Sequence, residues 1–532
     1  MQVTRVCGRA RRRVALICCM IAVIGYTTLS YSRGVHSNRA VRHAPAAAPV
    51  ASAAESRANL HAAVRYATMA APVVSAAASR ENTSLPTLDD PPEVWRASLL
   101  APEAGAEHAQ LRRTTFEHWA KLQRALVVDA PPGGDAVEVD GQPVARRFVV
   151  VRPCCQLCNR LRTLVSSIAL GILTDRAVLI DFEAEGYYGR LHDLYAPTVP
   201  LDAHLVATPK PKAALSWEFL LHGFLCDSAA VQRGGAGTLE VHGAPCFLHA
   251  LHLHPALSGR FREAFGGPEG LFAAIYRHFL PLERSLQARI DASFASLIGL
   301  SPGADAVHAG RPLTVGVHVR NGGDFRSAKL SAIEWARLAR SALELLPIER
   351  RAAAVFFVAA DGAASRETAR ETFANLLGSS ARVLLLPGLA KRTGCKADDA
   401  DCTVSREGAR VSLLELSLLA ACNVRVLSPM SSFSEMAAAV SARRAAYFHP
   451  DLQRKFHYET AVEVLPRVFV PHSVEMPASI ALGRTLDALT CGPAVRAAAG
   501  ADDVWTRPRG LIFLNGSRAM PHTLARKYAS ID

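Results

Sequence analysis

The chain has 532 residues, of which 50% are hydrophobic and 20% charged, so it can bury one or two substantial cores and is not disordered as a whole. Its formal net charge is +13, but residues 1–42 hold eight arginines and no acidic residue, which leaves a net +5 on the 490 residues that follow. So small a charge gives no support for nucleic-acid binding, which needs basic residues clustered on one face.

An uncharged run of eighteen residues, 14–31, follows five arginines near the N-terminus. Its length predicts a transmembrane signal anchor, and because basic flanks stay in the cytoplasm, we expect a cytoplasmic tail at 1–13 and a lumenal chain beyond residue 31. A cleaved signal peptide is the alternative, since residues 14–24 have the length of an h-region. Either interpretation sends the bulk of the chain into an oxidising compartment.

Residues 32–146 are predicted to form a stem that is largely flexible with some helix, because 44–79 are rich in Ala, Pro and Ser and lack sustained apolar periodicity. Glycosylation sequons begin at Asn82 and Asn515. Nine cysteines follow the apolar run, and structural disulfides are expected among them, although the sequence leaves their pairing open. Half of a zinc site is the alternative for the cluster Cys154, Cys155 and Cys158, but no second set of ligands at zinc spacing follows.

Two stretches of the chain alternate predicted strands with predicted helices. The first opens with a strand at 148–151, a helix at 159–174 and a strand at 177–182, and a further helix is expected at 283–298. The second has strands at 313–319, 354–360, 382–386, 424–427 and 445–448, separated by helices at 331–346, 366–377, 412–422 and 434–440. This alternation predicts an α/β fold of two Rossmann-like lobes, at 147–310 and 311–475, with parallel sheets facing a cleft and an extension at 476–532 packing back on them.

Ligands of open parallel sheets bind beyond the carboxyl ends of the strands, and polar residues follow four of the predicted strands. The strongest candidate is Arg320, because a guanidinium fork suits the diphosphate that departs from a nucleotide sugar. The alternative, a surface arginine in a salt bridge, is less favoured because Gly322 and Gly323 allow the backbone to approach a ligand closely. The other candidates from these strand ends are Asn159, Arg160, Asp324, Asp361, Ser431 and Ser432.

Each further candidate has a plain structural alternative. Ser431 and Ser432 open a predicted helix and offer an anion site, or they simply cap that helix. Glu415 lies in an apolar run and can accept from the adjacent N–H donors of guanine, or it belongs to a solvated polar stripe. His318 gains interest from its neighbour Arg320, although a strand histidine is more often structural. Asp324 and Asp361 are candidate base or ribose-binding carboxylates, and Asp-Gly also occurs in ordinary turns.

Three blocks of these residues resemble the inverting, GDP-fucose-dependent fucosyltransferase superfamily, which includes plant xyloglucan enzymes, α-(1→6) enzymes and protein O-fucosyltransferases. The blocks are CNRLRTLVSS at 158–167 with LTDRAVLI at 173–180, GVHVRNGGD at 316–324, and LLELSLLA at 413–420 with LSPMSSF at 427–433. The resemblance covers roughly residues 147–475. The sequence departs from the family's pattern at Gln156-Leu157-Cys158, at Met430 and at Glu435, which leaves the branch and the acceptor glycan open.

The resemblance implies a GT-B fold, GDP-fucose as the donor, no obligatory metal, and a Golgi type II membrane protein that acts on a glycan acceptor. It places Arg320 on the β-phosphate, His318 and Glu415 at the nucleoside, and Ser431 or Ser432 on phosphate. Asp324 is a candidate general base. Two other functions remain as alternatives: a metal-dependent GT-A transferase, because Asp399-Ala-Asp401 matches a DxD motif, and an inactive lumenal glycan-binding protein.

Overall fold

The computed structural model describes residues 90–130, 134–154, 156–182, 191–206, 213–215, 238–243, 246–254, 256–298, 312–320, 330–360, 363–377, 382–386, 406–429, 431–448 and 461–471. The predicted tail, anchor, sequons and C-terminal extension lie outside these residues. Within the described part of the chain, no helix combines the length and hydropathy needed to cross a bilayer.

The predicted alternation is present at 148–180 and 314–448, and the structure adds elements before residue 146, between residues 191 and 282, and after residue 460 that were not predicted. The helices are α3 (Pro92–Ser98), α4 (Ala109–Arg124), α5 (Leu157–Thr174), α8 (Leu248–Leu253), α9 (Ser258–Phe265), α10 (Leu271–Phe279), α11 (Arg284–Ile298), α12 (Ala332–Glu344), α13 (Ala363–Leu377), α14 (Arg406–Ala421) and α15 (Ser432–Ser441). The strands are β1 (Ala136–Val139), β2 (Gln142–Ala145), β3 (Phe148–Pro153), β4 (Ala177–Ile180), β5 (Ala213–Leu215), β6 (Leu239–Gly243), β7 (Thr314–Val319), β8 (Val355–Ala360), β9 (Arg382–Leu384), β10 (Val424–Leu427), β11 (Ala446–Phe448), β12 (Ala461–Leu465) and β13 (Val468–Pro471).

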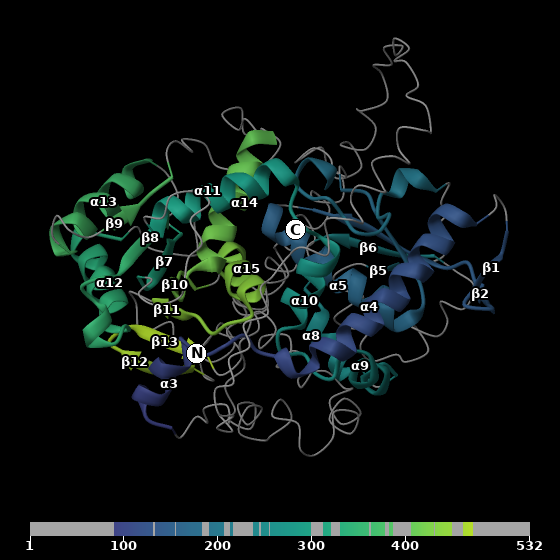
Figure 1. Cartoon of the computed structure of the whole chain (residues 1–532), viewed down its shortest axis with the longest axis horizontal. Helices are drawn as coiled ribbons and strands as arrows, with labels where there is room; N and C mark the ends of the chain where they lie inside the picture. The colour runs from purple at the N-terminus through teal and green to yellow at the C-terminus, as the bar shows by residue number, and fades with distance from the viewer. Residues whose placement is uncertain are drawn as a thin grey trace, which may run out of the picture. The chain divides into compact units, whose positions relative to one another are not determined.

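The N-terminal sheet has the strand order β4-β3-β6-β5, and its strands are parallel (Figure 1). Its middle strand β3 is a continuous apolar run, as expected for a strand covered on both faces. Helix α5 packs on β3. Gly171, near the end of the helix, allows α5 to approach β4 as well, since a Cβ there would lie 2.5 Å from a methyl group of Val178.

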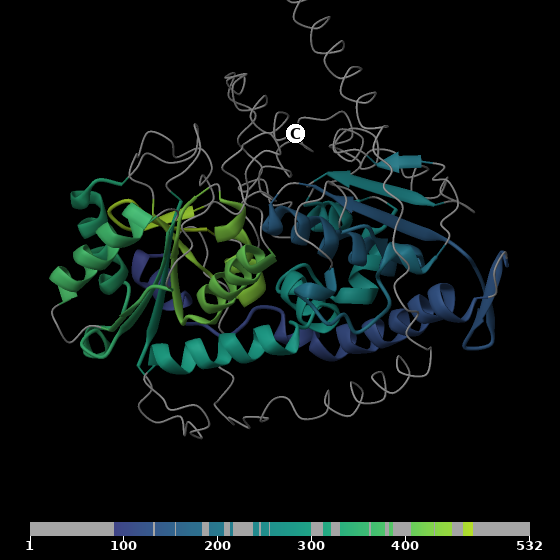
Figure 2. The ribbon, with the colours of Figure 1, turned by 90° about the horizontal axis from the view of Figure 1, so that it is seen from above.

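The C-terminal sheet has the order β12-β13-β11-β10-β7-β8-β9. The five strands from β11 to β9 are parallel, whereas the hairpin of β12 and β13, which was not predicted, adds antiparallel strands to one edge (Figures 1 and 2). The chain runs from β7 outward through β8 and β9, then returns to place β10 on the other side of β7. The strand order therefore reverses between β7 and β10, which is where ligands of doubly wound sheets bind.

Helix α11 lies within the stretch 147–310 that we assigned to the N-terminal lobe, but it packs on the C-terminal sheet. It contacts α14, β8 and β9. Its apolar residues Leu286, Ile290 and Leu297 fall on one helical face and are buried. The chain therefore crosses to the C-terminal sheet near residue 283, well before the predicted boundary.

Part of the predicted stem is folded. Phe116 and Trp119 of α4 are buried: the ring of Phe116 packs on those of Phe265 and Phe279, and Nε1 of Trp119 donates to the carbonyl of Arg176 beside β4. The side-chain amide of Gln123 donates to the carbonyl of Val178 at 2.8 Å and accepts from its N–H at 2.8 Å, which satisfies the outer edge of β4. Trp95 of α3 lies in the core of the C-terminal sheet. Residues 92–145 therefore belong to the globular unit, because their apolar side chains recur at helical spacing and are buried.

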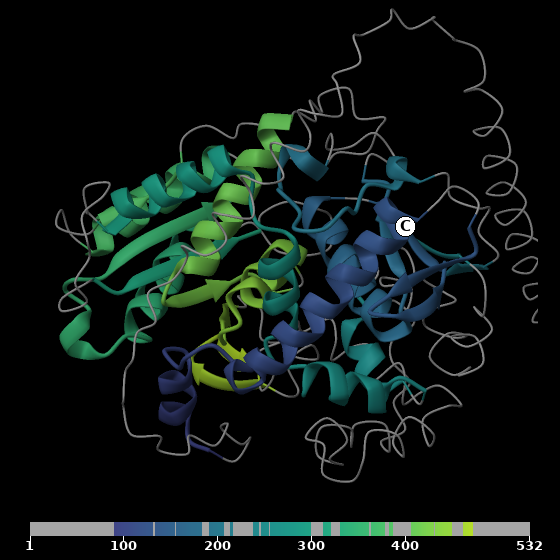
Figure 3. The same ribbon diagram turned by 45° about the vertical axis from the view of Figure 1, so that its right-hand side comes forward.

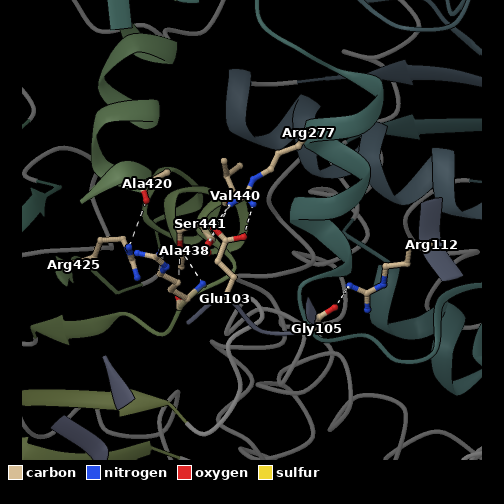
Figure 4. Close-up of polar contacts among 10 residues, drawn as sticks. Glu103, Gly105, Arg112, Arg277, Ala420, Arg425, Ala438, Val440 and Ser441 are labelled. Atoms are coloured by element: carbon tan, nitrogen blue, oxygen red, sulfur yellow. Dashed lines mark hydrogen bonds and ion pairs between the residues drawn. The ribbon is translucent and has the colours of Figure 1, made fainter. Parts of the chain in front are cut away.

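The connection between α3 and α4 is held by one arginine of α10 and one of α4 (Figure 4). Arg277 of α10 pairs with Glu103 and donates to the carbonyl of Val440 at 2.9 Å, at the end of α15. Arg112 donates to the carbonyl of Gly105 at 3.4 Å. This connection thus ties α10 to the C-terminal end of α15.

One hydrophobic core extends through both sheets. It contains β3, β4 and α10 from the N-terminal half together with α14, α15 and the inward face of β8. Helix α15 contacts α5 and α10, and α14 contacts α11, β7 and β8 (Figure 3). A second core covers the other face of the C-terminal sheet under α12 and α13. The two sheets therefore share buried apolar surface and do not meet only through a linker.

Candidate functional site at the carboxyl end of β7

The ends of β7 and β10 are joined by one hydroxyl at the point where the strand order reverses. The Oγ of Ser428 accepts from the N–H of Arg320 at 2.9 Å and donates to the carbonyl of His318 at 3.1 Å. Ser428 is buried and comes directly after β10. Gly316, in the middle of β7, lets α14 approach, because a Cβ there would lie 3.1 Å from the sulfur of Cys422. Close packing thus fixes the backbone from which Arg320 projects.

His318 is buried beneath this strand end, with 5% of its surface exposed. Its Nδ1 lies 2.7 Å from Oγ of Ser434, and its ring centre lies 4.9 Å from that of Phe433. Burial, together with the positive charges of Arg320 and Arg366, lowers the pKa of His318 to about 3. The imidazole is therefore neutral at physiological pH, and it orients the first turn of α15.

Arg320 is half-buried and lies where its charge reaches both halves of the molecule. That charge lowers the pKa of His318, and it also acts on the thiol of Cys158 in the first turn of α5. Burial nevertheless raises the pKa of Cys158 to about 12, so this thiol stays protonated. The disulfide expectation is wrong for Cys158 and for Cys422, which are both buried thiols. The charge of Arg320 therefore acts on a group of α5 as well as on one of β7.

Ser431 and Ser432 begin α15, as predicted. Ser431 is the N-cap residue and is buried, but its hydroxyl makes no capping bond to the helix. The interpretation of this hydroxyl as a simple cap is therefore wrong. The backbone N–H groups of the first turn and both hydroxyls lie at a helix N-terminus, where an anion is favoured.

Glu415 of α14 is buried, so the solvated polar stripe is not what the structure shows. Its Oε1 lies 2.7 Å from Nη2 of Arg366, and the two side chains are 8% and 11% exposed. Arg366 also donates to the carbonyls of Ala360 at 2.9 Å and Leu386 at 3.1 Å, at the ends of β8 and β9. Arg366 was not predicted, although a carboxylate in an apolar run was expected to need a partner.

Asn159 and Arg160 lie in the first turn of α5, where the structure gives them different surroundings. Oδ1 of Asn159 accepts from Nη2 of Arg162 at 2.7 Å. Arg160 is fully buried, and its Nη1 donates to the carbonyls of Pro153 at 2.7 Å and Phe182 at 3.0 Å. Its guanidinium therefore holds the ends of β3 and β4 together and does not face solvent.

Several predicted groups lie outside the described residues, namely Asp324, Asp361 and the Asp399-Ala-Asp401 triplet. Among the residues that are described, no group of three His, Cys, Asp or Glu side chains is placed to hold a metal ion. A surface pocket of about 250 Å³ lies between α4, the end of α5 and α9, and it is lined by Trp119, Asp175 and Arg260 among others. The predicted site residues do not line this pocket.

Known proteins resemble the chain in structure more than in sequence. No family model matches the sequence, and no curated protein matches it either. The structure is similar to those of GDP-fucose fucosyltransferases over most of the chain. FUT1 of Arabidopsis thaliana in complex with GDP has a TM-score of 0.47 and 15% identity, over 68% of this chain and 83% of that one. The α-1,6-fucosyltransferase NodZ soaked with GDP-fucose has a TM-score of 0.37 and 18% identity, over 58% of this chain and 96% of that one. A structure of NodZ from Bradyrhizobium has the same TM-score and identity, over 57% of this chain and 95% of that one. POFUT1 in complex with GDP has a TM-score of 0.28 and 12% identity, over 57% and 98%.

Proposed function

We propose that the chain is a glycosyltransferase that transfers fucose from GDP-fucose to a glycan hydroxyl with inversion. The observation that carries the proposal is the position of Arg320, at the strand-order reversal of a doubly wound sheet and beside the N-terminus of α15. The choice of GDP-fucose comes from the sequence blocks around Cys158, Arg320 and Ser431, which resemble those of fucosyltransferases.

In this reaction the acceptor oxygen forms a bond to C1 of fucose while the bond from C1 to the β-phosphate oxygen breaks. GDP leaves with the bonding electron pair, and the acceptor's proton passes to a base. Negative charge therefore grows on the diphosphate in the transition state. A guanidinium and a helix N-terminus that are already in place stabilise that charge without reorganising.

The remaining residues have supporting roles in the proposal. Guanine presents adjacent N–H donors beside a carbonyl acceptor, and the Glu415–Arg366 pair offers a carboxylate beside a donor. His318 is neutral and bonded to Ser434, so it positions α15 and does not act as the base. Asp324 remains the candidate base, and Asp361 a candidate ribose ligand.

We also propose that the protein is a Golgi type II membrane protein, anchored by residues 14–31 with the folded unit in the lumen. The support is the uncharged run and the arginines before it. Protease protection of a C-terminal tag in intact vesicles tests the orientation. Digestion of the tag without detergent would contradict it.

A donor screen with the purified full-length chain tests the activity. GDP-fucose, GDP-mannose and UDP-sugars are each assayed for transfer and hydrolysis, with and without excess chelator. We expect GDP-fucose to be turned over in chelator. Preference for a UDP-sugar would overturn the fucosyl assignment, loss of activity in chelator would favour a metal-dependent transferase, and glycan binding without turnover would favour an inactive lectin.

A further inference from the structure

Helices α5 and α15 are joined by an ion pair that neither local sequence predicts. Nη1 of Arg162 lies 3.0 Å from Oε2 of Glu435, and the two side chains are 13% and 8% exposed. Nη2 of Arg162 also donates to Oδ1 of Asn159 at 2.7 Å. Glu435 is one of the positions at which the sequence departs from the fucosyltransferase pattern.

Glu435 occupies an unusual place for a helix that is to receive an anion. It lies in the first turn of α15, with its N–H bonded to the carbonyl of the N-cap residue Ser431. A carboxylate in the first turn interacts favourably with the helix N-terminus itself. It also repels a second anion brought to the same end of the helix. Glu435 alone would therefore oppose diphosphate binding beside Ser431.

The charge of Arg162 offsets this repulsion. Arg162 and Glu435 are paired at the first turn of α15, and the backbone of Arg320 is bonded to Ser428, three residues before the N-cap of that helix. The charges of Arg162, Arg320 and Glu435 all act on the thiol of Cys158. These three groups are two cations and one anion, and their charges sum to +1. Without Arg162 the net charge is zero, and without Glu435 it is +2.

We propose that Arg162 is a charge-compensating residue of the donor site, which neutralises Glu435 so that Arg320 and the N-terminus of α15 attract the diphosphate of the donor. This inference rests on the proposed function. It assigns Arg162 a role through Glu435 and not through contact with the sugar. An alternative role for the pair, a mechanical tie between α5 and α15, makes different predictions for the double variant.

The test measures GDP affinity by titration calorimetry for the wild type, Arg162→Met, Glu435→Gln and the double variant. We expect Arg162→Met to weaken GDP binding about tenfold or more, since it leaves a carboxylate near the phosphates. Glu435→Gln keeps a hydrogen-bond partner for Arg162 and should bind GDP at least as tightly as the wild type. The double variant restores the net charge of +1 and should recover most of the lost affinity.

Arg410→Met is the matched control. Arg410 of α14 pairs with Glu283 at 3.1 Å and is 15% exposed, so its loss breaks a comparable pair outside the site and should leave GDP affinity unchanged. Equal weakening in both single variants without recovery in the double variant would overturn the inference in favour of a mechanical tie. Wild-type affinity for GDP in Arg162→Met would also overturn the inference. Glu435→Gln keeps the test decisive if Arg162→Met does not fold. Failure of the wild type to bind GDP would instead refute the proposed function itself.

Discussion

Arg366 and Glu415 form an ion pair, 2.7 Å between Nη2 and Oε1, that joins the start of α13 to the middle of α14 across the end of β8. Because both side chains are nearly inaccessible, removal of one partner leaves the other charge buried and uncompensated. We expect Arg366→Met to lower the free energy of unfolding by about 3–5 kcal/mol, measured by urea denaturation. Arg289→Met, which breaks an exposed pair with Glu407, should cost less than about 1 kcal/mol. Equal losses in the two variants would contradict a buried pair.

Replacement of Arg320 should impair turnover more than stability, because the residue is only partly buried and its backbone N–H, which the substitution keeps, is bonded to Ser428. We expect Arg320→Ala to lower kcat/KM for GDP-fucose by about 10²–10³-fold, the usual loss for one group that stabilises transition-state charge. Arg320→Lys should recover only part of the activity, since an ammonium cannot bind two phosphate oxygens in the same way. Wild-type kcat/KM in Arg320→Ala would refute its role.

Ser428 links the ends of β7 and β10, so Ser428→Ala should loosen the backbone at Arg320. We expect a loss of about 1–2 kcal/mol in unfolding free energy, because the N–H of Arg320 loses a partner. KM for GDP-fucose should rise as well. Ser412→Ala is the control, since the Ser412 hydroxyl is buried and donates to the Gly408 carbonyl in its own helix at 2.8 Å. A rise in KM for the control but not for Ser428→Ala would contradict this assignment.

The titration of His318 should make stability depend on pH. Its pKa is about 3 in the folded state and 6.5 when unperturbed, so the unfolded chain binds the proton more readily. The stabilisation is complete above pH 6.5 and is lost as the pH falls toward 3, with a slope of at most about 1.4 kcal/mol per pH unit. His318→Asn should flatten the pH dependence of unfolding free energy in this window. An unchanged slope in the variant would show that the histidine does not titrate as described.

Most of the C-terminal sheet could be predicted from the sequence. Its strands are short apolar runs separated by amphipathic helices, and the predicted ranges for β7, β10 and α12 agree with the structure to within two residues at each end. The position of α15 was also predicted, because Ser431 and Ser432 mark a helix start. Local sequence patterns are sufficient to predict a strand or helix where that element buries a continuous apolar face.

The errors arise where a long-range contact determines the outcome. The spacing of Phe116, Trp119 and Leu122 is helical and was a usable signal for α4, but the Ala-rich chain before it favoured a flexible stem. Nothing local distinguishes Arg366 or Arg162 from a surface arginine, because their partners Glu415 and Glu435 are far away in sequence. The sequence also does not indicate that Arg160 donates to the carbonyls of Pro153 and Phe182, because the ends of β3 and β4 bring these partners together only in the fold.

The apolar core that runs through both sheets limits how the protein can be recombined. A chimera that exchanged only residues 311–471 would replace α15 while keeping the surfaces of α5 and α10 on which it lies, and would replace α14 while keeping α11. The new side chains would then meet mismatched neighbours and leave voids or overlaps. Donor specificity can therefore be transplanted only together with the matching residues of the opposite half.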